Sequence, residues 1–151
     1  MEMEERDGET IVTARLPRSA DLCYRLFSDV DLLGEWLTVV GTIVARHRDE
    51  QGRPLEVAFT GHLLRASIAY TLVYEYRDDQ REVLWSESGG GVRRLAGSAR
   101  FTPDGPESCV LRYGLASELP PQLPQWADSF YASRPAQTVV MDFCAWIRQQ
   151  P

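Results

Sequence analysis

Glu87 is the side chain whose type and position best suit acid–base chemistry. It shares one face of a predicted strand with Val83 and Trp85, because alternate residues of a strand point to the same side. A carboxyl group beside aromatic side chains has a raised proton affinity and can act as a general acid or base, assisted by the hydroxyl of Tyr70 or Tyr74. The alternative is that Glu87 lies at the solvent-exposed end of its strand, next to the glycine-rich stretch that follows.

The other reactive residue types do not form a recognisable motif. His47 and His62 have neither HExxH nor HxH spacing, and Cys23, Cys109 and Cys144 contain no C-x-x-C pair. The chain has no lysine, which excludes both a Schiff-base lysine and a phosphate-binding P-loop lysine. We therefore predict no metal and no cofactor, and we interpret the cysteines as buried small hydrophobic residues in a reducing compartment.

Composition sets further limits on location and partners. The 151 residues are 44% hydrophobic with a net charge of −6, which is typical of one globular domain, residues 1–151. No basic stripe is present, so binding to a nucleic-acid backbone is not expected. The N-terminus lacks the pattern of a signal peptide, and no apolar run is long enough to span a membrane. We predict a cytoplasmic protein in which residues 1–8 are frayed; nothing in the composition sets its oligomeric state.

The first third of the chain predicts one strand and two helices. A strand over Thr10–Leu16 ends at Pro17, and Ser19 is a good N-cap for the helix that follows. Asp31 is predicted to cap a second short helix over Leu32–Leu37. The first helix carries a single apolar stripe, made of Leu22, Cys23, Leu26, Phe27 and Val30.

Most of the remaining chain predicts an antiparallel sheet, followed by one helix. Between Thr38 and Glu118, alternating apolar residues are separated by turn sequences. After Pro135, apolar residues recur at helical spacing. One inward face of this predicted sheet carries Ile68, Tyr70, Leu72, Tyr74 and Tyr76. The order of elements predicts the α+β class, with a curved antiparallel sheet around a C-terminal helix and two short helices after the first strand.

This order resembles the START-like (SRPBCC) superfamily, the helix-grip fold shared by polyketide cyclases and lipid-transfer domains. The resemblance covers roughly residues 9–149, and the order of its motifs carries it more than any single one does. The matching segments are Ser19–Val30 for the first helix, Gly34–Trp36, Tyr70–Tyr74 with Val83–Trp85 for the central strands, Leu95–Phe101 and Cys109–Tyr113.

The resemblance implies an apolar cavity between the sheet, the last helix and the two short helices. The side chains expected to line it are Trp36, Phe59, Tyr70, Leu72, Tyr74, Trp85, Tyr113, Val140 and Phe143. The implied function is binding of a small apolar or aromatic ligand, such as a lipid, an isoprenoid or a polyketide-like molecule. One alternative is a cyclase or dehydratase that uses Glu87 and a tyrosine. A second is a protein-interaction module similar to chaperone co-activators. The alternative to a cavity is that the aromatic side chains fill the core.

Overall fold

The structure is a computed structural model that describes residues 1–6, 8–37, 42–63, 66–90, 94–118 and 134–151. Three α-helices are described, α1 (Ala20–Phe27), α2 (Val30–Trp36) and α4 (Arg134–Ile147), with a single 3-10 turn, η1 (Asp78–Gln80). The strands are β1 (Glu2–Arg6), β2 (Glu9–Leu16), β3 (Thr42–Arg48), β4 (Pro54–Leu63), β5 (Ala66–Arg77), β6 (Glu82–Gly90), β7 (Arg94–Gly105) and β8 (Ser108–Glu118).

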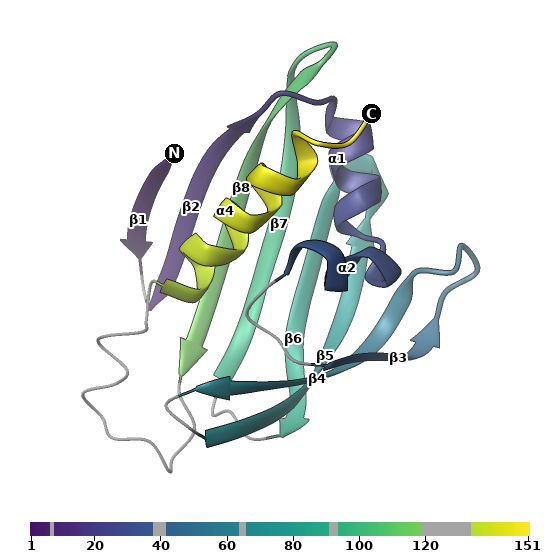
Figure 1. Ribbon diagram of the computed structural model, residues 1–151, viewed down its shortest axis with the longest axis vertical. Coiled ribbons are helices and arrows are strands. Elements are labelled where there is room, and N and C mark those ends of the chain that lie inside the picture. The colour runs from purple at the N-terminus through teal and green to yellow at the C-terminus, as the bar shows by residue number, and fades with distance from the viewer. Residues whose placement is uncertain (7, 38–41, 64–65, 91–93, 119–133) are drawn as a thin grey trace.

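The strands form one antiparallel sheet in the order β1-β2-β8-β7-β6-β5-β4-β3. Figure 1 shows α4 lying across one face of this sheet, with α1 and α2 covering the neighbouring part of the same face. The α4 helix packs against β2 and β8, and α1 packs against β7. The predicted helix-grip fold of the α+β class is therefore confirmed.

The register of the central strands places alternate side chains on the face that α4 covers. Trp85 of β6 pairs with Tyr74 of β5 on one side and with Gly97 of β7 on the other. Gly97 makes room for the indole ring, because a Cβ atom there would lie 2.5 Å from the Gly114 carbonyl oxygen and 2.7 Å from the Trp85 ring. This glycine therefore sets how closely Trp85 lies against the sheet.

The predicted N-cap residue is correct for α1 and wrong for α2. The Ser19 hydroxyl accepts a hydrogen bond from the Leu22 N–H at 3.2 Å, which confirms the predicted N-cap of α1. The prediction of Asp31 as the cap of α2 is wrong, because Asp29 is the N-cap and its carboxylate accepts the Asp31 N–H at 3.0 Å. The helix begins two residues earlier than predicted because Asp29 can satisfy an N–H of the first turn.

The N-terminus differs from expectation as well. Where we expected frayed residues, Glu2–Arg6 form β1, which pairs with β2 along the sheet edge. All five β1 side chains are exposed, so the strand carries no alternating apolar pattern that the sequence could reveal. Pairing instead satisfies the backbone groups of β2, which would otherwise be the sheet edge.

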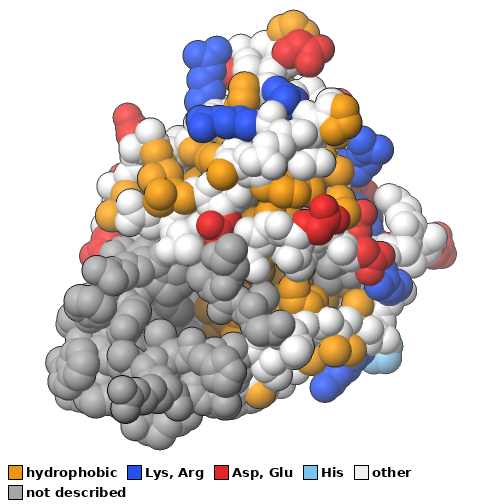
Figure 2. Space-filling view, in the orientation of Figure 1, with side chains coloured by type: hydrophobic (Ala, Val, Ile, Leu, Met, Phe, Trp, Pro, Cys, Tyr) orange, Lys and Arg blue, Asp and Glu red, His pale blue; other side chains and the backbone are white. Residues whose placement is uncertain are grey.

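A densely packed core lies where α1 and α4 meet β2, β7 and β8. Cys23 and Cys109 are both fully buried in it, as predicted, whereas Cys144 of α4 is only partly buried. The largest fully buried side chains of the described residues are Phe101, Phe143, Leu16, Leu111, Ile147, Val12, Val57, Val83, Val140, Cys23 and Cys109. None of the described helices has both the length and the apolar composition needed to cross a membrane. On the face shown in Figure 2, acidic and basic side chains both surround the hydrophobic ones.

Candidate ligand-binding cavity

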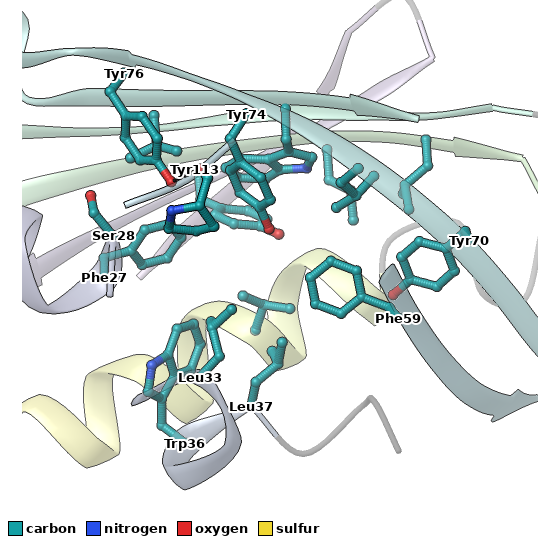
Figure 3. A pocket seen from close by; sticks show the side chains of 17 residues that line it. Phe27, Ser28, Leu33, Trp36, Leu37, Phe59, Tyr70, Tyr74, Tyr76 and Tyr113 are labelled. Carbon is teal, nitrogen blue, oxygen red and sulfur yellow. Dashed lines mark hydrogen bonds between the residues drawn. The ribbon is translucent and has the colours of Figure 1, made fainter. Parts of the chain in front are cut away.

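An apolar cavity of about 130 Å³ lies between the sheet, the two short helices and α4. Figure 3 shows the sheet residues pointing from one side toward α2 and α4 on the other. The described residues that line it are Phe27, Ser28, Leu33, Trp36, Leu37, Pro54, Phe59, Tyr70, Leu72, Tyr74, Tyr76, Val83, Trp85, Leu95, Tyr113, Leu115 and Val139. Ligand cavities are typically apolar with a few polar groups, and this wall has that composition.

Most side chains expected at the wall do line the cavity. They are Trp36, Phe59, Tyr70, Leu72, Tyr74, Trp85 and Tyr113. Val140 and Phe143 do not line it, because both are fully buried in the packed core, and the neighbouring Val139 borders the cavity instead. Successive helical residues differ by about 100° in direction, so one position along α4 decides which valine meets the cavity.

Sequence reasoning missed several wall residues. Tyr76 and Val83 lie on strand faces that the alternation had already assigned inward, and Phe27 lies on the predicted apolar stripe of α1. Their patterns were visible, but nothing in a pattern separates a residue beside a cavity from one beside another side chain. Ser28 and Pro54 had no apolar pattern at all to mark them.

Aromatic rings form much of the wall and contact one another. Phe59 and Tyr70 stack at one end, with ring centroids 5.3 Å apart and planes 19° apart. Trp85 and Tyr113 lie 5.4 Å apart on the neighbouring strands. Such pairs hold large side chains in defined positions, so the rings of the wall position one another.

The tyrosine hydroxyls of the wall stay protonated at neutral pH. Burial raises the pKa of Tyr70 from its ordinary value of 10.0 to about 12. Burial also raises the pKa of Tyr74 and of Tyr113. Figure 3 shows the hydroxyls of Tyr74 and Tyr113 directed away from the sheet, into the space beneath it. These groups can therefore donate hydrogen bonds to a ligand, but they are poor bases.

Tyr76 differs from the other wall tyrosines because the fold uses its hydroxyl. This group donates a hydrogen bond to the Pro54 carbonyl oxygen at 2.6 Å. The Arg53 guanidinium lies 4.3 Å from the centre of the Tyr76 ring and forms ion pairs with Asp49 and Asp78. This polar network fixes the Tyr76 ring next to the turn between β3 and β4.

Two polar atoms of the wall have no hydrogen-bond partner among the described residues. They are the Ser28 hydroxyl oxygen and the Trp36 indole nitrogen Nε1, both of which are buried. Ser28 is the C-cap of α1, and Trp36 is the last residue of α2. Buried polar groups are almost always hydrogen-bonded, so this pair is unusual.

Glu87 is half-buried and is not one of the wall residues. On β6 it pairs with Leu72 of β5, next to an irregularity in the register of the two strands. The cavity wall described above therefore holds tyrosine hydroxyls without the Glu87 carboxylate, which the enzymatic alternative would pair with a tyrosine. Among the described residues, no group of three or more histidine, cysteine, aspartate and glutamate side chains is arranged to hold a metal ion.

Solved structures of other proteins share this architecture. A START superfamily protein from Mycobacterium smegmatis has a TM-score of 0.81 at 16% identity, covering 93% of this chain and 97% of that one. The Zhui aromatase/cyclase from Streptomyces sp. R1128 has a TM-score of 0.71 at 11% identity, covering 98% and 95%. A STAR-related lipid transfer protein from Xanthomonas axonopodis has a TM-score of 0.71 at 14% identity, covering 97% and 92%.

At the level of sequence, no protein-family model and no curated protein matches the chain. The structural likeness covers 93%, 98% and 97% of this chain in the three cases. The chain therefore has the START-like, helix-grip fold.

Proposed function

We propose that the protein binds a small, largely apolar ring molecule in the cavity between the sheet and α4. The observation that carries this proposal is a cavity of about 130 Å³ lined mainly by aromatic and aliphatic side chains. An apolar cavity of about 150 Å³ in another protein stays dry and binds benzene, so this volume suits a single aromatic ring. Burial of such a ring removes apolar surface from water, which contributes about 25 cal/mol per Å².

The size of the space narrows the ligand classes that the fold suggests. Drug-sized ligands usually occupy cavities of about 300–1,000 Å³. The described cavity therefore supports an aromatic or cyclic ligand, or one ring of a polyketide-like molecule, over a whole extended lipid chain. One of the similar solved structures is named as a cyclase and another as a lipid transfer protein. These names do not decide between a cyclic ligand and a lipid chain, since one fold hosts many functions.

The enzymatic alternative has less support than binding. It requires a proton-transfer group within hydrogen-bond reach of the ligand. Glu87 is not part of the described wall, and raised pKa values keep Tyr70 and Tyr74 protonated, so these hydroxyls can donate a proton but cannot act as the base. A cyclase that used these residues would need a different arrangement of β6, so we propose ligand binding as the function.

Calorimetric and thermal titration with p-xylene tests the proposal. We expect saturable binding, and a rise in melting temperature of about 5–10 °C at a hundredfold excess of p-xylene over its Kd. Val139→Phe should fill the cavity and weaken binding by about tenfold or more. Met141→Phe is the matched control, because Met141 lies two residues away on α4 and is 53% exposed.

Two results would contradict the proposal. The first is the absence of saturable p-xylene binding to the wild-type protein. The second is equal binding by the wild type and Val139→Phe, which would move the binding site out of this cavity.

A further inference from the structure

We infer that the cavity takes a neutral ring molecule with an oxygen atom at its edge, and that the hydroxyls of Tyr74 and Tyr113 form the hydrogen-bonding site for this oxygen. The inference rests on the proposed function and adds a chemical class to it. The ligand would be a phenol, a cyclic alcohol or a cyclic ketone. A pure hydrocarbon would fill the same space without using the two hydroxyls, and an ionised ring compound would be excluded.

The first support is the direction of the two hydroxyls. Tyr74 of β5 and Tyr113 of β8 both line the cavity, and Figure 3 shows their oxygen atoms pointing away from the sheet into the space beneath it. Tyr113 also contributes to the raised pKa of Tyr74, so the two phenol groups are near enough to interact electrostatically. A ring in the cavity therefore has both hydroxyls on its sheet side.

The second support is that one indole ring positions both tyrosines. Trp85 of β6 lies between β5 and β8 in the order of the sheet. Its ring centroid is 6.3 Å from that of Tyr74 and 5.4 Å from that of Tyr113. Because these ring contacts hold both phenol groups in place, their hydroxyls are preorganised, and a ligand does not have to order them on binding.

The third support is a contrast with a wall tyrosine whose hydroxyl serves the fold. Tyr76 donates its hydroxyl hydrogen to the Pro54 carbonyl oxygen at 2.6 Å. For Tyr74 and Tyr113, burial and neighbouring tyrosines raise the pKa, and no hydrogen bond to a described side chain contributes. A hydroxyl that faces an apolar space gains a hydrogen bond when a ligand brings an oxygen to it, and this gain appears as affinity.

The fourth support is the neutral character of the described wall. None of the described residues that line the cavity is an aspartate, glutamate, lysine, arginine or histidine. A charged ligand group would lose its hydration there without meeting an opposite charge among them, which costs far more free energy than burying a neutral oxygen. A tyrosine hydroxyl can donate to a carbonyl oxygen, and it can donate to or accept from a phenol or an alcohol. These properties favour neutral oxygen compounds.

The experiment compares p-xylene, p-cresol and the anion 4-methylbenzoate, which share a methylated ring and differ in the group opposite the methyl. Calorimetric titration at pH 7 gives each Kd, and the measured quantity is the Kd of p-xylene divided by the Kd of p-cresol. We expect Tyr74→Phe and Tyr113→Phe each to lower this ratio by about three- to tenfold, while the Kd of p-xylene changes by less than about twofold. We expect 4-methylbenzoate to bind at least about tenfold more weakly than p-cresol.

Tyr76→Phe is the matched control, because it removes the same atom from a wall tyrosine whose hydroxyl is already bonded to Pro54. It should leave the ratio unchanged and lower the melting temperature of the empty protein by about 2–4 °C, through loss of that hydrogen bond. Tyr74→Phe and Tyr113→Phe should change the melting temperature of the empty protein less than this control does.

Each contrary outcome has a separate meaning. If p-xylene binds and the ratio is unchanged in both variants, or falls as much in Tyr76→Phe, the inference is wrong and the proposed function stands. A fall in only one of Tyr74→Phe and Tyr113→Phe would show that the pair is not the site. If 4-methylbenzoate binds as tightly as p-cresol, the ligand need not be neutral and the inference is again wrong. If neither p-xylene nor p-cresol binds the wild-type protein, the proposed function itself fails.

Discussion

Phe143 of α4 and Phe59 of β4 both lie between the sheet and the helices, but their surroundings differ. Phe143 is fully buried and contacts the rings of Phe27, Trp36 and Phe101. Phe59 is nearly as buried, yet it borders the cavity and stacks on Tyr70. Burial alone therefore does not tell a packed core residue from a residue beside a cavity.

The difference follows from where the helices press on the sheet. The α4 helix packs against β2 and β8, and α1 packs against β7, so side chains there fill the space completely. The cavity wall comes largely from β4, β5 and β6, farther along the curved sheet (Figure 1). The same inward alternation of apolar residues thus produces a packed core under the helices and a cavity beside them.

The largest expected effect is a difference between two identical substitutions. Phe143→Ala should lower the free energy of unfolding by about 3–5 kcal/mol, because it leaves a new void in a packed region. Phe59→Ala should cost clearly less, since one side of this ring already faces empty space and has fewer contacts to lose. Urea unfolding of both variants measures the difference, and equal losses would show that the two regions are packed alike.

A second pair of substitutions compares neighbouring positions on α4. Val140→Phe should lower the free energy of unfolding by about 1–3 kcal/mol, because Val140 has no space beside it. Val139→Phe should have a smaller effect on stability, because its ring enters the cavity. Thermal unfolding checks both, and a reversed order would place the cavity on the other side of the helix.

Alkaline pH should affect the cavity wall through its tyrosines. The pKa of Tyr70 is about 12 in the folded protein and near 10 when unfolded, so folding favours the protonated form. Stability from this group is complete below pH 10 and is lost as the pH rises from 10 to 12, by about 1.4 kcal/mol per unit. Tyr70→Phe should lose less stability than the wild type over this interval, as measured by urea unfolding at each pH. Parallel curves would contradict the buried position of the hydroxyl.

The smallest expected effect is that of pH on ligand affinity: between pH 6 and 9 we expect no change in the Kd of p-xylene. The wall tyrosines remain protonated there because burial raises their pKa values. The Kd of p-xylene, measured by calorimetry at several pH values, should therefore stay constant. A titration curve in this range would instead point to an ionisable group near the ligand, with Glu87 as the first residue to substitute.

The sequence predicted the sheet and the helices because their patterns are strong. Alternation assigned Tyr70, Leu72 and Tyr74 to one inward face, and the register with β6 agrees with this. The edge strand β1 was missed because all of its side chains are exposed, so its pairing depends on backbone hydrogen bonds alone. Asp29 and Asp31 are both good capping residues, and only the path of the chain decides between them.

The cavity could be predicted only in part. Side-chain periodicity gives the face of an element but not its rotation or its distance from a neighbour, so Val140 was expected where Val139 lies. Gly97 controls the position of Trp85, but a glycine in a strand does not reveal which ring it accommodates. Ser28 borders the cavity without any sequence signal, because a polar residue at a helix end belongs to no apolar pattern.

The most direct test of the proposed cavity site is the position of a bound ring in solution. Intermolecular nuclear Overhauser effects between the methyl groups of p-xylene and the protein would measure it. We expect contacts to Leu72, Phe59 and Val139, and none to the exposed Met141. Contacts to Met141, without any to the wall residues, would contradict binding in the cavity.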